Sequence, residues 1–330
     1  MWPTSAGSRR AEDVGHVPVL VSEVLEGLAP VTGGVYVDGT VGLGGHAEAL
    51  LRHPAGVGRV IGLDRDASAL DLAAARLAPF ADRLTLVHNT FAALPDVLAV
   101  QGLKGVHGIL LDLGISSHQL EHSGRGFAFS RDEPLDMRMD ESEGITAAEM
   151  VNRLPAEGLA EVIRVYGEER WARRIAAAIV RARQKTPIRT SAELAGVVTS
   201  AIPARYRTRR IHPATRTFQA LRIAVNRELD ALKEALDVLP SCLLPGGRLC
   251  VISFHSLEDR MVKHAFREDV RLAVITRRPV TPSTAEVAVN PRARSAKLRV
   301  AARRDAAGRR GRAAGAPADI PGRGRQGGRS

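Results

Sequence analysis

The sequence has few cysteines and no long apolar run. Cys242 and Cys250 are its only cysteines, and both lie among apolar residues, which fits neither a disulfide framework nor a zinc knuckle. No run reaches the roughly 18 apolar residues of a transmembrane helix, and residues 1–15 lack the apolar centre of a signal peptide. We therefore expect a protein of the reducing cytoplasm with no membrane partner, and we interpret residues 1–15 as a disordered leader.

Acidic residues are scarce at the C-terminal end. Residues 292–330 hold eleven arginines and one lysine against two aspartates, so this end carries ten of the eleven net positive charges of the chain. The rest of the sequence is nearly neutral. A basic end that is rich in glycine can follow phosphates through counterion release, or it can be a solubilising disordered tail. The sequence leaves both interpretations open for the predicted tail, residues 304–330.

A glycine-rich loop lies at residues 38–46, between an apolar run and a predicted helix. The apolar run, residues 35–37, ends at Asp38, and helical spacing begins at His46. The loop contains four glycines, Gly39, Gly42, Gly44 and Gly45. Glycines at this point let the backbone turn tightly and approach a ligand at the start of a helix. We therefore predict a nucleotide-like ligand at the end of the first strand.

Apolar runs alternate with helical segments on both sides of this loop. The predicted strands are followed by helical patterns, as at 67–80, which indicates βαβ units and a parallel sheet. Further strand and helix signals return after residue 213, where one long helix, a fifth strand, another helix and two short strands at the sheet edge are predicted. The first four strands are predicted at 35–38, 59–66, 84–89 and 108–114, and the later elements at 217–239, 246–255, 257–266, 271–276 and 297–302.

Strand signals nearly vanish between residues 118 and 212. Helical stretches replace them at 155–166, 170–183 and 191–201. We therefore predict a mainly helical domain, residues 118–213, inserted between two parts of an α/β core, residues 16–117 and 214–303.

Asp64 lies at the end of the second predicted strand, 22 residues after Gly42. A carboxylate at this spacing can accept the hydroxyl hydrogens of an adenosine ribose. The alternative is a cap for the next helix, a role that Asp66 can fill alone. We therefore favour a ligand contact for Asp64.

The pattern G-x-G-x-x-A at residues 42–47 is also typical of dinucleotide dehydrogenases, so an NAD-dependent oxidoreductase is an alternative. However, Asp38 and Asp112 also end predicted strands. Carboxylates would repel a diphosphate but suit the cationic cofactor S-adenosylmethionine. We therefore prefer a methyl donor as the ligand.

Two other motifs resemble hydrolase patterns. His118 and His122 match H-x-x-E-H, but they directly follow a strand-end turn and lack a predicted third ligand, so we expect no metal. Residues 253–260 hold Ser, His, Glu and Asp close together, yet there is no G-x-S-x-G elbow. We expect this polar run to line the same crevice as the glycine loop.

Arginine occurs with phenylalanine and methionine in residues 124–140, and with phenylalanine in residues 212–219. Such side chains can stack on and hold an unpaired base. Arg–Asp pairs that fasten the inserted domain to the core are an equally good interpretation.

These motifs together resemble one family, the bacterial 16S rRNA cytosine-N4 methyltransferases of the RsmH (MraW) type. The resemblance covers about residues 16–303. It rests on DGTVGLGGH (38–46), LDLGISS (111–117), PLDMRMD (134–140), YGEE (166–169), HPATRTFQALR (212–222), SFHSLEDR (253–260) and NPRARS (290–295). It implies a class I, Rossmann-like fold that methylates the exocyclic N4 of a cytidine in the decoding region of 16S rRNA, with an inserted helical domain that recognises the substrate.

The family pattern also implies which residues contact S-adenosylmethionine. These are Gly44, Gly45, His46, Asp64, Phe91, Asp112 and Gln119. The amine of cytosine is a poor nucleophile because its lone pair is delocalised, so acceptors for its N–H bonds are needed. Our hypotheses for this amine pocket are Asp136, Ser253 and His255.

The resemblance implies 16S rRNA, within the small ribosomal subunit, as the partner. It leaves open whether the chain forms a homodimer. A non-catalytic RNA-binding ribosome factor is the second alternative to the methyltransferase.

Overall fold

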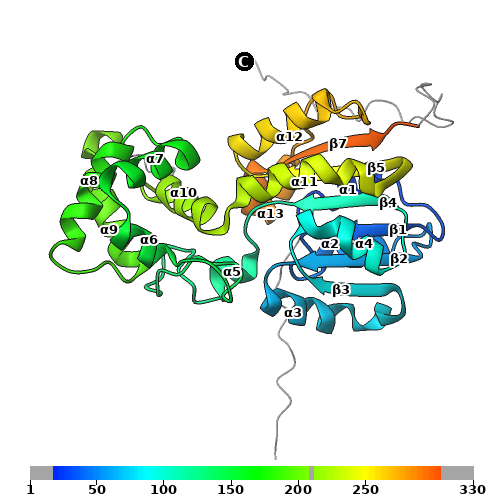
Figure 1. Ribbon diagram of the computed structural model, residues 1–330, viewed down its shortest axis with the longest axis horizontal. Helices are drawn as coiled ribbons and strands as arrows, with labels where there is room; N and C mark the ends of the chain where they lie inside the picture. Colours follow the sequence, from blue (N-terminus) through cyan, green and yellow to red (C-terminus); the bar gives the residue numbers. More distant parts are fainter. Residues whose placement is uncertain (1–17, 208–211, 306–330) are drawn as a thin grey trace, which may run out of the picture.

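A computed structural model of the protein describes residues 18–207 and 212–305. The predicted leader and the predicted tail beyond Asp305 lie outside the described residues. The chain forms a sheet-based part and a separate group of helices beside it (Figure 1). Two connections join these parts, one at α5 (Ser117–Glu121) and one where α10 (Thr215–Asn226) leads into α11 (Glu228–Cys242).

The sheet has seven strands in the order β3-β2-β1-β4-β5-β7-β6. The first five strands along the chain are parallel, while β7 and β6 are antiparallel to their neighbours. The predicted α/β class and both predicted edge strands are therefore confirmed. The strands are β1 (Val35–Asp38), β2 (Arg59–Asp64), β3 (Leu84–His88), β4 (Val106–Asp112), β5 (Leu243–Ser253), β6 (Leu272–Val274) and β7 (Lys297–Arg303).

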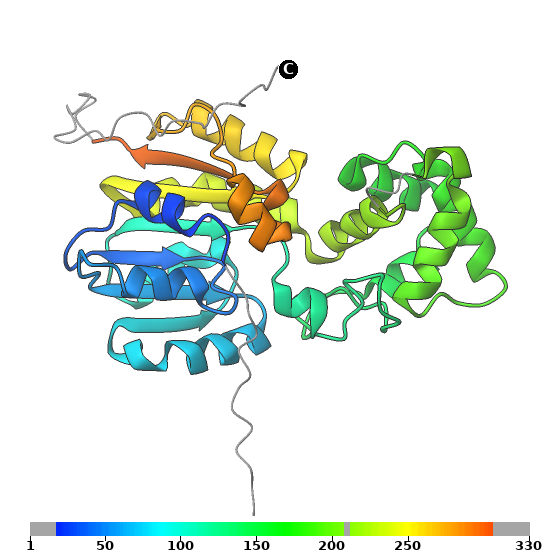
Figure 2. The ribbon, with the colours of Figure 1, turned by 180° about the vertical axis from the view of Figure 1, so that it is seen from behind.

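Helices cover both faces of the sheet because both faces are apolar. In β4, Ile109 and Leu111 join one hydrophobic cluster, and Leu110 between them joins the other. One face carries α4 (Leu94–Val100), α11 and α12 (Ser256–Glu268), as Figure 1 shows. The opposite face carries α1 (Val21–Leu28), α2 (Gly45–Leu51) and α3 (Ala67–Leu77) (Figure 2). This is the doubly wound arrangement that binds ligands at the carboxyl ends of its strands.

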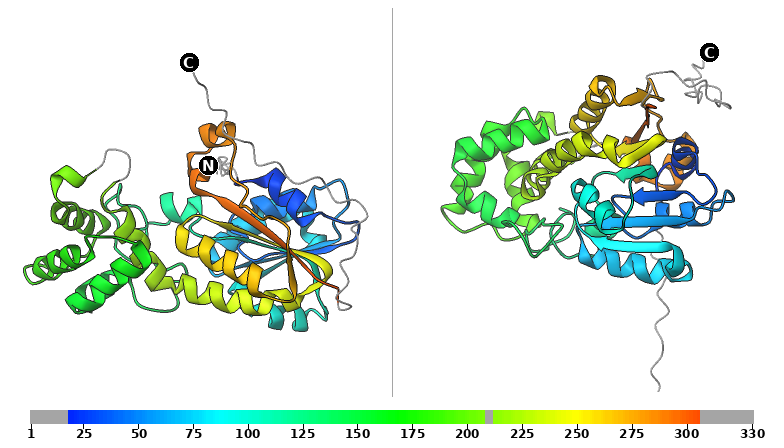
Figure 3. Two further views of the ribbon diagram at one scale, coloured as in Figure 1. Left: turned by 90° about the horizontal axis from the view of Figure 1, so that it is seen from above. Right: turned by 45° about the vertical axis from the view of Figure 1, so that its right-hand side comes forward.

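The helical part has a hydrophobic core of its own. This core gathers buried side chains from Phe127 to Leu221, among them Ile163, Ile175 and Leu194. The part stands beside the sheet rather than on either of its faces (Figure 3). Besides α10, its helices are α6 (Ala147–Arg153), α7 (Ala156–Gly167), α8 (Ala172–Arg183) and α9 (Ser191–Ala201), followed by the short η3 (Ala204–Tyr206).

The predicted single helix over residues 217–239 is wrong. The chain forms α10 and α11 there, separated at Arg227, which has a left-handed backbone with φ of 49°. Both segments have helical periodicity, so sequence pattern alone does not mark the break. Because of it, α10 packs in the helical core and α11 packs against the sheet. The predicted domain boundary after residue 213 thus falls before an element that packs with the helical part.

Four short elements complete the described chain: η1 (Ala78–Arg83), η2 (Phe91–Ala93), α13 (Thr284–Val289) and η4 (Pro291–Ser295). Cys242 and Cys250 are both free and buried. In residues 18–207 and 212–305, none of the helices has the length and apolar character needed to cross a membrane.

Candidate active site

A crevice opens at the carboxyl ends of β1, β2 and β4. The glycine loop after β1 forms its floor, and residues from α5, α11, α12 and the short helix η2 (Phe91–Ala93) contribute to its walls. Residues from both the sheet and the connections to the helical part therefore meet at one place. Its polar lining includes Thr40, His46, Asp64, Asp112, Gln119, Glu228 and Glu258.

The backbone of the glycine loop is held by the strand ends around it. Gly42 has a φ of 49°, a left-handed conformation that side chains disfavour, and its N–H donates to Asp64 Oδ2 at 2.8 Å. A Cβ on Gly39 would lie 2.6 Å from Leu111 Cδ2 and 3.0 Å from Phe91 Cβ, so a larger residue would displace the neighbouring side chains. Thr40 Oγ1 accepts from the backbone N–H of Asp112 at 2.6 Å, which joins the loop to β4.

Asp64, predicted as a ligand contact, ends β2 and lines the crevice. Its Oδ1 accepts from the backbone N–H of Asp66 at 2.9 Å, while its Oδ2 holds the loop at Gly42. Burial raises the pKa of this carboxyl, and the backbone hydrogen bonds offset part of that effect. The carboxyl is fixed in position and retains lone pairs for a ligand hydroxyl.

Asp38 does not line the crevice. The argument for a cationic ligand relied on both Asp38 and Asp112 as acids at strand ends. The side chain is 1% exposed and accepts from the backbone N–H of Thr40 at 3.2 Å. Burial, together with the nearby charge of Asp64, raises the pKa of Asp38 to about 7. This carboxyl shapes the loop from beneath, so the electrostatic argument rests on Asp112.

Asp112 ends β4 and faces the crevice. Burial and the negative charges of Asp38 and Glu258 raise the pKa of Asp112 to about 8. Its Oδ1 is buried and, within the described part of the chain, has no hydrogen-bond partner. His46 Nδ1 lies 3.9 Å from Asp112 Oδ2, and His46 Nε2 bonds the carbonyl of Val19 at 2.9 Å. The arrangement leaves an incompletely compensated acid that a bound cation would stabilise.

Gln119 lines the crevice through an amide that the protein already orients. Its Oε1 accepts from the Ser116 N–H at 3.1 Å, and its Nε2 donates to Asp66 Oδ2 at 2.8 Å. Arg125 Nη2 donates to the same oxygen at 2.5 Å. Burial alone would raise the pKa of Asp66, but the hydrogen bonds from Ser68, Arg125 and Gln119 lower it. Asp66 is therefore an ionised structural acid whose charge is balanced by its neighbours. It also caps α3, as expected.

The remaining predicted cofactor residues fall into two groups. Gly45 and Phe91 line the crevice together with His46. Gly44 is not among the lining residues: a Cβ there would lie 2.9 Å from Leu77 Cδ1, and its φ is 81°. The physical requirement for glycine at position 44 is thus the turn into α2 and its packing on α3.

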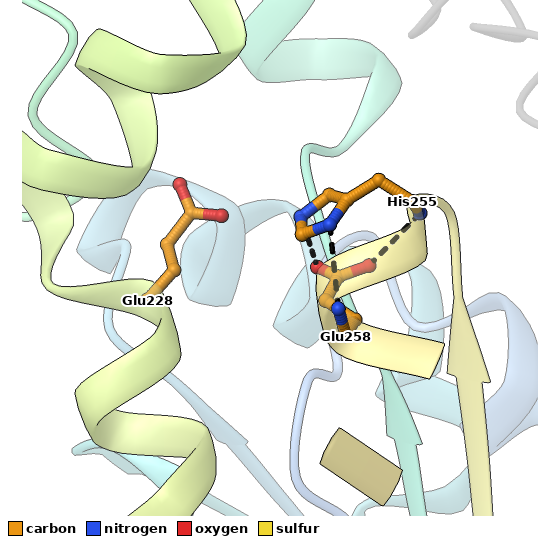
Figure 4. Close-up of side chains that lie close together, drawn as sticks. All are labelled: Glu228, His255 and Glu258. Carbon is orange, nitrogen blue, oxygen red and sulfur yellow. Dashed lines mark hydrogen bonds and ion pairs between the residues drawn. The ribbon is translucent and has the colours of Figure 1, made fainter. Parts of the chain in front are cut away.

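Glu258, which the sequence analysis did not select, faces the crevice from the first turn of α12. Its Oε2 accepts from the backbone N–H groups of Phe254 at 2.8 Å and His255 at 3.3 Å. His255 Nε2 lies 3.1 Å from Glu258 Oε1, and His255 Nδ1 accepts the backbone N–H of Glu258 (Figure 4). Burial would raise the pKa of Glu258, but His255 and Arg222 lower it. An ionised carboxylate therefore lies close to Asp112.

None of the three residues that were hypothesised for the amine pocket lines the crevice itself, but His255 contacts Glu258, which does. Ser253 is 1% exposed, and its hydroxyl donates to the carbonyl of Lys297 at 3.4 Å. Asp136 lies in the segment before α6, where Arg138 binds both carboxylate oxygens at 2.8 Å. Neither Ser253 nor Asp136 lines the crevice.

Among the described residues, the single group of side chains with metal-like spacing is Glu228, His255 and Glu258, whose ligand atoms lie within 4.8 Å of one another. Figure 4 draws the side chains of Glu228, His255 and Glu258. Arg222 forms an ion pair with Glu228 and donates to both of its carboxylate oxygens at 2.8 Å. His118 and His122, the H-x-x-E-H pair, stack with ring centroids 6.2 Å apart and do not belong to that group.

The sequence profile of the MraW methylase family matches residues 13–304. The chain belongs to the MraW methylase family. A relative from Geobacter sp. strain M21, named ribosomal RNA small subunit methyltransferase H, is 51% identical over 307 residues, which are 88% of this chain and 98% of the relative. A protein of the same name from Thermobifida fusca is 49% identical over 322 residues, 91% of this chain and 97% of its own. A solved rRNA methylase from Streptococcus thermophilus is 11% identical, with a TM-score of 0.41 over 86% of this chain and 94% of its own.

Membership of the MraW methylase family confirms the predicted class I methyltransferase and its methyl donor, S-adenosylmethionine. The residues of the crevice fit this cofactor, because the loop after β1 offers close backbone approach and Asp64 offers an acceptor. Asp112 offers positive charge a buried oxygen that has no hydrogen-bond partner among the described residues. The comparisons give no support to an NAD-dependent oxidoreductase or to a non-catalytic RNA-binding factor.

In this MraW methylase, the sequence contained one signal for Glu258 that was passed over. The residue lies three positions after His255, a spacing typical of a capping box at the start of a helix. A capping acid is normally exposed, whereas this one is 2% exposed and faces a ligand crevice. Only the tertiary position of the first turn of α12, at the lining of the crevice, reveals that difference.

Proposed function

We propose that the protein transfers a methyl group from S-adenosylmethionine to the exocyclic N4 of a cytidine in the decoding region of 16S rRNA. The proposal rests on one structural observation: a cofactor crevice flanked by Asp64 and Asp112 opens beside a separate helical part. Relatives that are about half identical over nearly their whole length are named ribosomal RNA small subunit methyltransferase H.

On the cofactor side, we assign the predicted contacts according to their positions. Asp64 accepts the ribose hydroxyls, and Phe91 packs against the adenine from the start of η2. Asp112, with His46 beside it, faces the cationic end of the cofactor, while Gly45 and Gln119 complete the wall. Gly44 acts indirectly, because it allows the turn that brings Gly45 to the crevice.

On the acceptor side, we assign the N4 proton to the pair His255–Glu258. S-adenosylmethionine, when bound, supplies an electrophilic methyl group on a positively charged sulfur. Methyl transfer would form a carbon–nitrogen bond, leave the electron pair of the broken carbon–sulfur bond on the sulfur, and require the amine nitrogen to lose a proton. Glu258 accepts that proton, since a methylated aromatic amine that carries positive charge is acidic enough to protonate a carboxylate. The backbone N–H groups of Phe254 and His255 hold the Glu258 carboxylate in place, and His255 Nε2 lies 3.1 Å from Glu258 Oε1.

The catalytic roles hypothesised for Asp136 and Ser253 stay predictions. We also propose that the helical part, predicted as residues 118–213, holds the RNA substrate, because the target base must be unstacked to enter the crevice. A ribosomal substrate implies a cytoplasmic location.

The test is the transfer of labelled methyl from S-adenosylmethionine to small ribosomal subunits from cells that lack this protein. Subunits from normal cells and naked rRNA serve as controls. We expect label in one cytidine of the 16S rRNA, confined to the deficient subunits, and hydrolysis to nucleosides identifies the methylated atom. Cofactor binding without label in any of the three substrates would overturn the proposed acceptor and leave the methyl donor in place.

A further inference from the structure

Two of the few aromatic side chains of this protein lie together on the helical part. The chain has two tryptophans and three tyrosines, and the rings of Trp171 and Tyr206 are 5.2 Å apart between centroids. Trp171 lies between α7 and α8, whereas Tyr206 ends η3 after α9. Tyr206 is 39% exposed and Trp171 is partly buried. Two large rings therefore meet at the surface from separate segments.

Arginines cover these rings. The guanidinium carbon of Arg170 lies 5.2 Å from the Trp171 ring centroid and 4.6 Å from that of Tyr206, while that of Arg205 lies 4.9 Å from Tyr206. Both arginines are exposed. In the described residues, neither guanidinium has a carboxylate within ion-pair distance, unlike the many arginines elsewhere in the chain that have one. The positive charge at this surface is thus available to an anionic partner.

Acidic side chains near this cluster are already engaged. Glu169 is 7% exposed and accepts from the backbone N–H of Trp171 at 2.9 Å. Glu168 binds Ser256 and, at 3.2 Å, Arg260, both on α12 of the sheet-based part. The contact between Glu168 and Arg260 also places the cluster in the molecule. It joins the turn before Trp171 to α12, the helix that presents Glu258 to the crevice. The cluster therefore lies on the side of the helical part that approaches the cofactor site.

We propose that Arg170, Trp171, Arg205 and Tyr206 form a stacking platform for an unpaired nucleotide of the RNA substrate, outside the crevice that takes the target base. The inference rests on the proposed function. Every base offers a flat face to an aromatic ring, and guanidinium groups beside the ring add stacking and neutralise phosphate. An acidic peptide would meet the same charges, but two stacked rings favour a partner with flat aromatic groups. The platform helps to hold the substrate strand open while the target cytidine is in the crevice.

Trp171 fluorescence provides a direct test. In a Trp2→Phe variant of the full chain, Trp171 is the only tryptophan, so its emission reports on the platform alone. We expect a single-stranded pyrimidine dodecamer of RNA to quench this emission, and the same strand in a duplex to quench it much less. Tyr206→Ala in this background is expected to weaken the binding of the single strand about ten- to hundredfold, and Tyr206→Phe to leave it nearly unchanged.

Arg164→Ala is the matched control, because Arg164 is an exposed arginine of α7 that is paired with Glu161 at 2.6 Å and has no ring beneath it. Arg170→Ala should weaken RNA binding and lower its salt dependence, and Arg164→Ala should do neither. Equal RNA affinity in Tyr206→Ala and its parent, or equal quenching by single strand, duplex and an acidic peptide, would overturn the platform.

Methyl transfer separates this inference from the proposed function. With small subunits as substrate, Tyr206→Ala should raise KM about tenfold with little change in kcat and in cofactor affinity. If no variant, including the parent, methylated any RNA, the proposed function would fail. The fluorescence titration would still decide whether the platform binds RNA.

Discussion

On the β2 side of the crevice, Asp66 lies 3% exposed against Arg125, which is 7% exposed, and Gln119 completes its hydrogen bonding. On the β4 side, Asp112 has an oxygen without a partner in the described residues, and the negative charge of the nearby Glu258 helps to raise the pKa of Asp112. The protein balances the charge of the buried acid on one side of the crevice and leaves the buried acid on the other side without full compensation.

This difference separates structural acids from binding acids. A carboxylate whose charge is balanced by other side chains of the protein stabilises the fold whether or not a ligand is bound. The lowered pKa of Asp66 reflects this balance. A carboxylate with a raised pKa, such as Asp112, costs free energy in the free protein and is stabilised when a cation binds. The contrast also has a spatial consequence: the Asp66–Arg125 pair joins β2 to the segment before α6, so it fastens the helical part beside the cofactor.

Removal of the balanced pair should have the largest effect. Arg125→Ala leaves Asp66 buried without its cation, and we expect the free energy of unfolding to fall by about 3–5 kcal/mol. Denaturant unfolding measures this loss. The double variant Asp66→Asn/Arg125→Leu should recover part of it because no charge remains buried. Arg164→Ala, which breaks an exposed pair, should change stability little. An Arg125→Ala protein as stable as the parent would refute the contrast between the two sides.

Glu258→Gln tests the other side through turnover. The amide keeps the shape of the side chain and can still accept a backbone N–H, but it cannot take a proton. We expect kcat for methyl transfer to fall about a hundredfold, with the affinity for S-adenosylmethionine nearly unchanged. Single-turnover assays and calorimetry give the two quantities. Equal losses in kcat and in cofactor affinity would show that Glu258 shapes the cofactor site instead.

Asp112→Asn should stabilise the free protein and weaken the cofactor complex. The folded state holds the Asp112 proton more tightly than the unfolded chain, with a pKa of about 8 against 3.8. The free energy of unfolding therefore falls as the pH rises between these values, and the asparagine removes that loss, so the gain is largest at pH 8 and above. Cofactor affinity should drop about tenfold. In the parent, affinity should rise with pH up to about 8, and this rise should be absent in the variant.

Asp136→Ala should have the smallest effect on turnover. Its carboxylate is bound by Arg138 and is not part of the crevice lining. Burial raises the pKa of Asp136, but the hydrogen bonds from Arg138 outweigh that effect and lower it. We expect a loss of about 1 kcal/mol in the free energy of unfolding and methyl transfer within about twofold of the parent. A hundredfold drop in kcat without loss of stability would restore Asp136 as a catalytic candidate.

The parallel strands, the glycine loop and Asp64 could be predicted because their signals are local. An apolar run, a glycine cluster and an acid at fixed spacing define one βαβ unit whatever surrounds it. Gln119 was reached only through family resemblance. Its role depends on Asp66, 53 positions earlier in the chain, and no local pattern links the two residues.

Local patterns in the chain predict the fold class, the ligand-binding loop and the helical region, since hydrophobic period and turn chemistry act over a few residues. Long-range packing sets which acid is protonated, which is ionised and which faces a ligand. Local sequence does not distinguish the four acids Asp38, Asp66, Asp112 and Glu258. Their pKa values and roles differ because distant segments of the chain supply their burial and their partners. The break at Arg227 belongs to the same class, because only packing against two different cores ends α10 there.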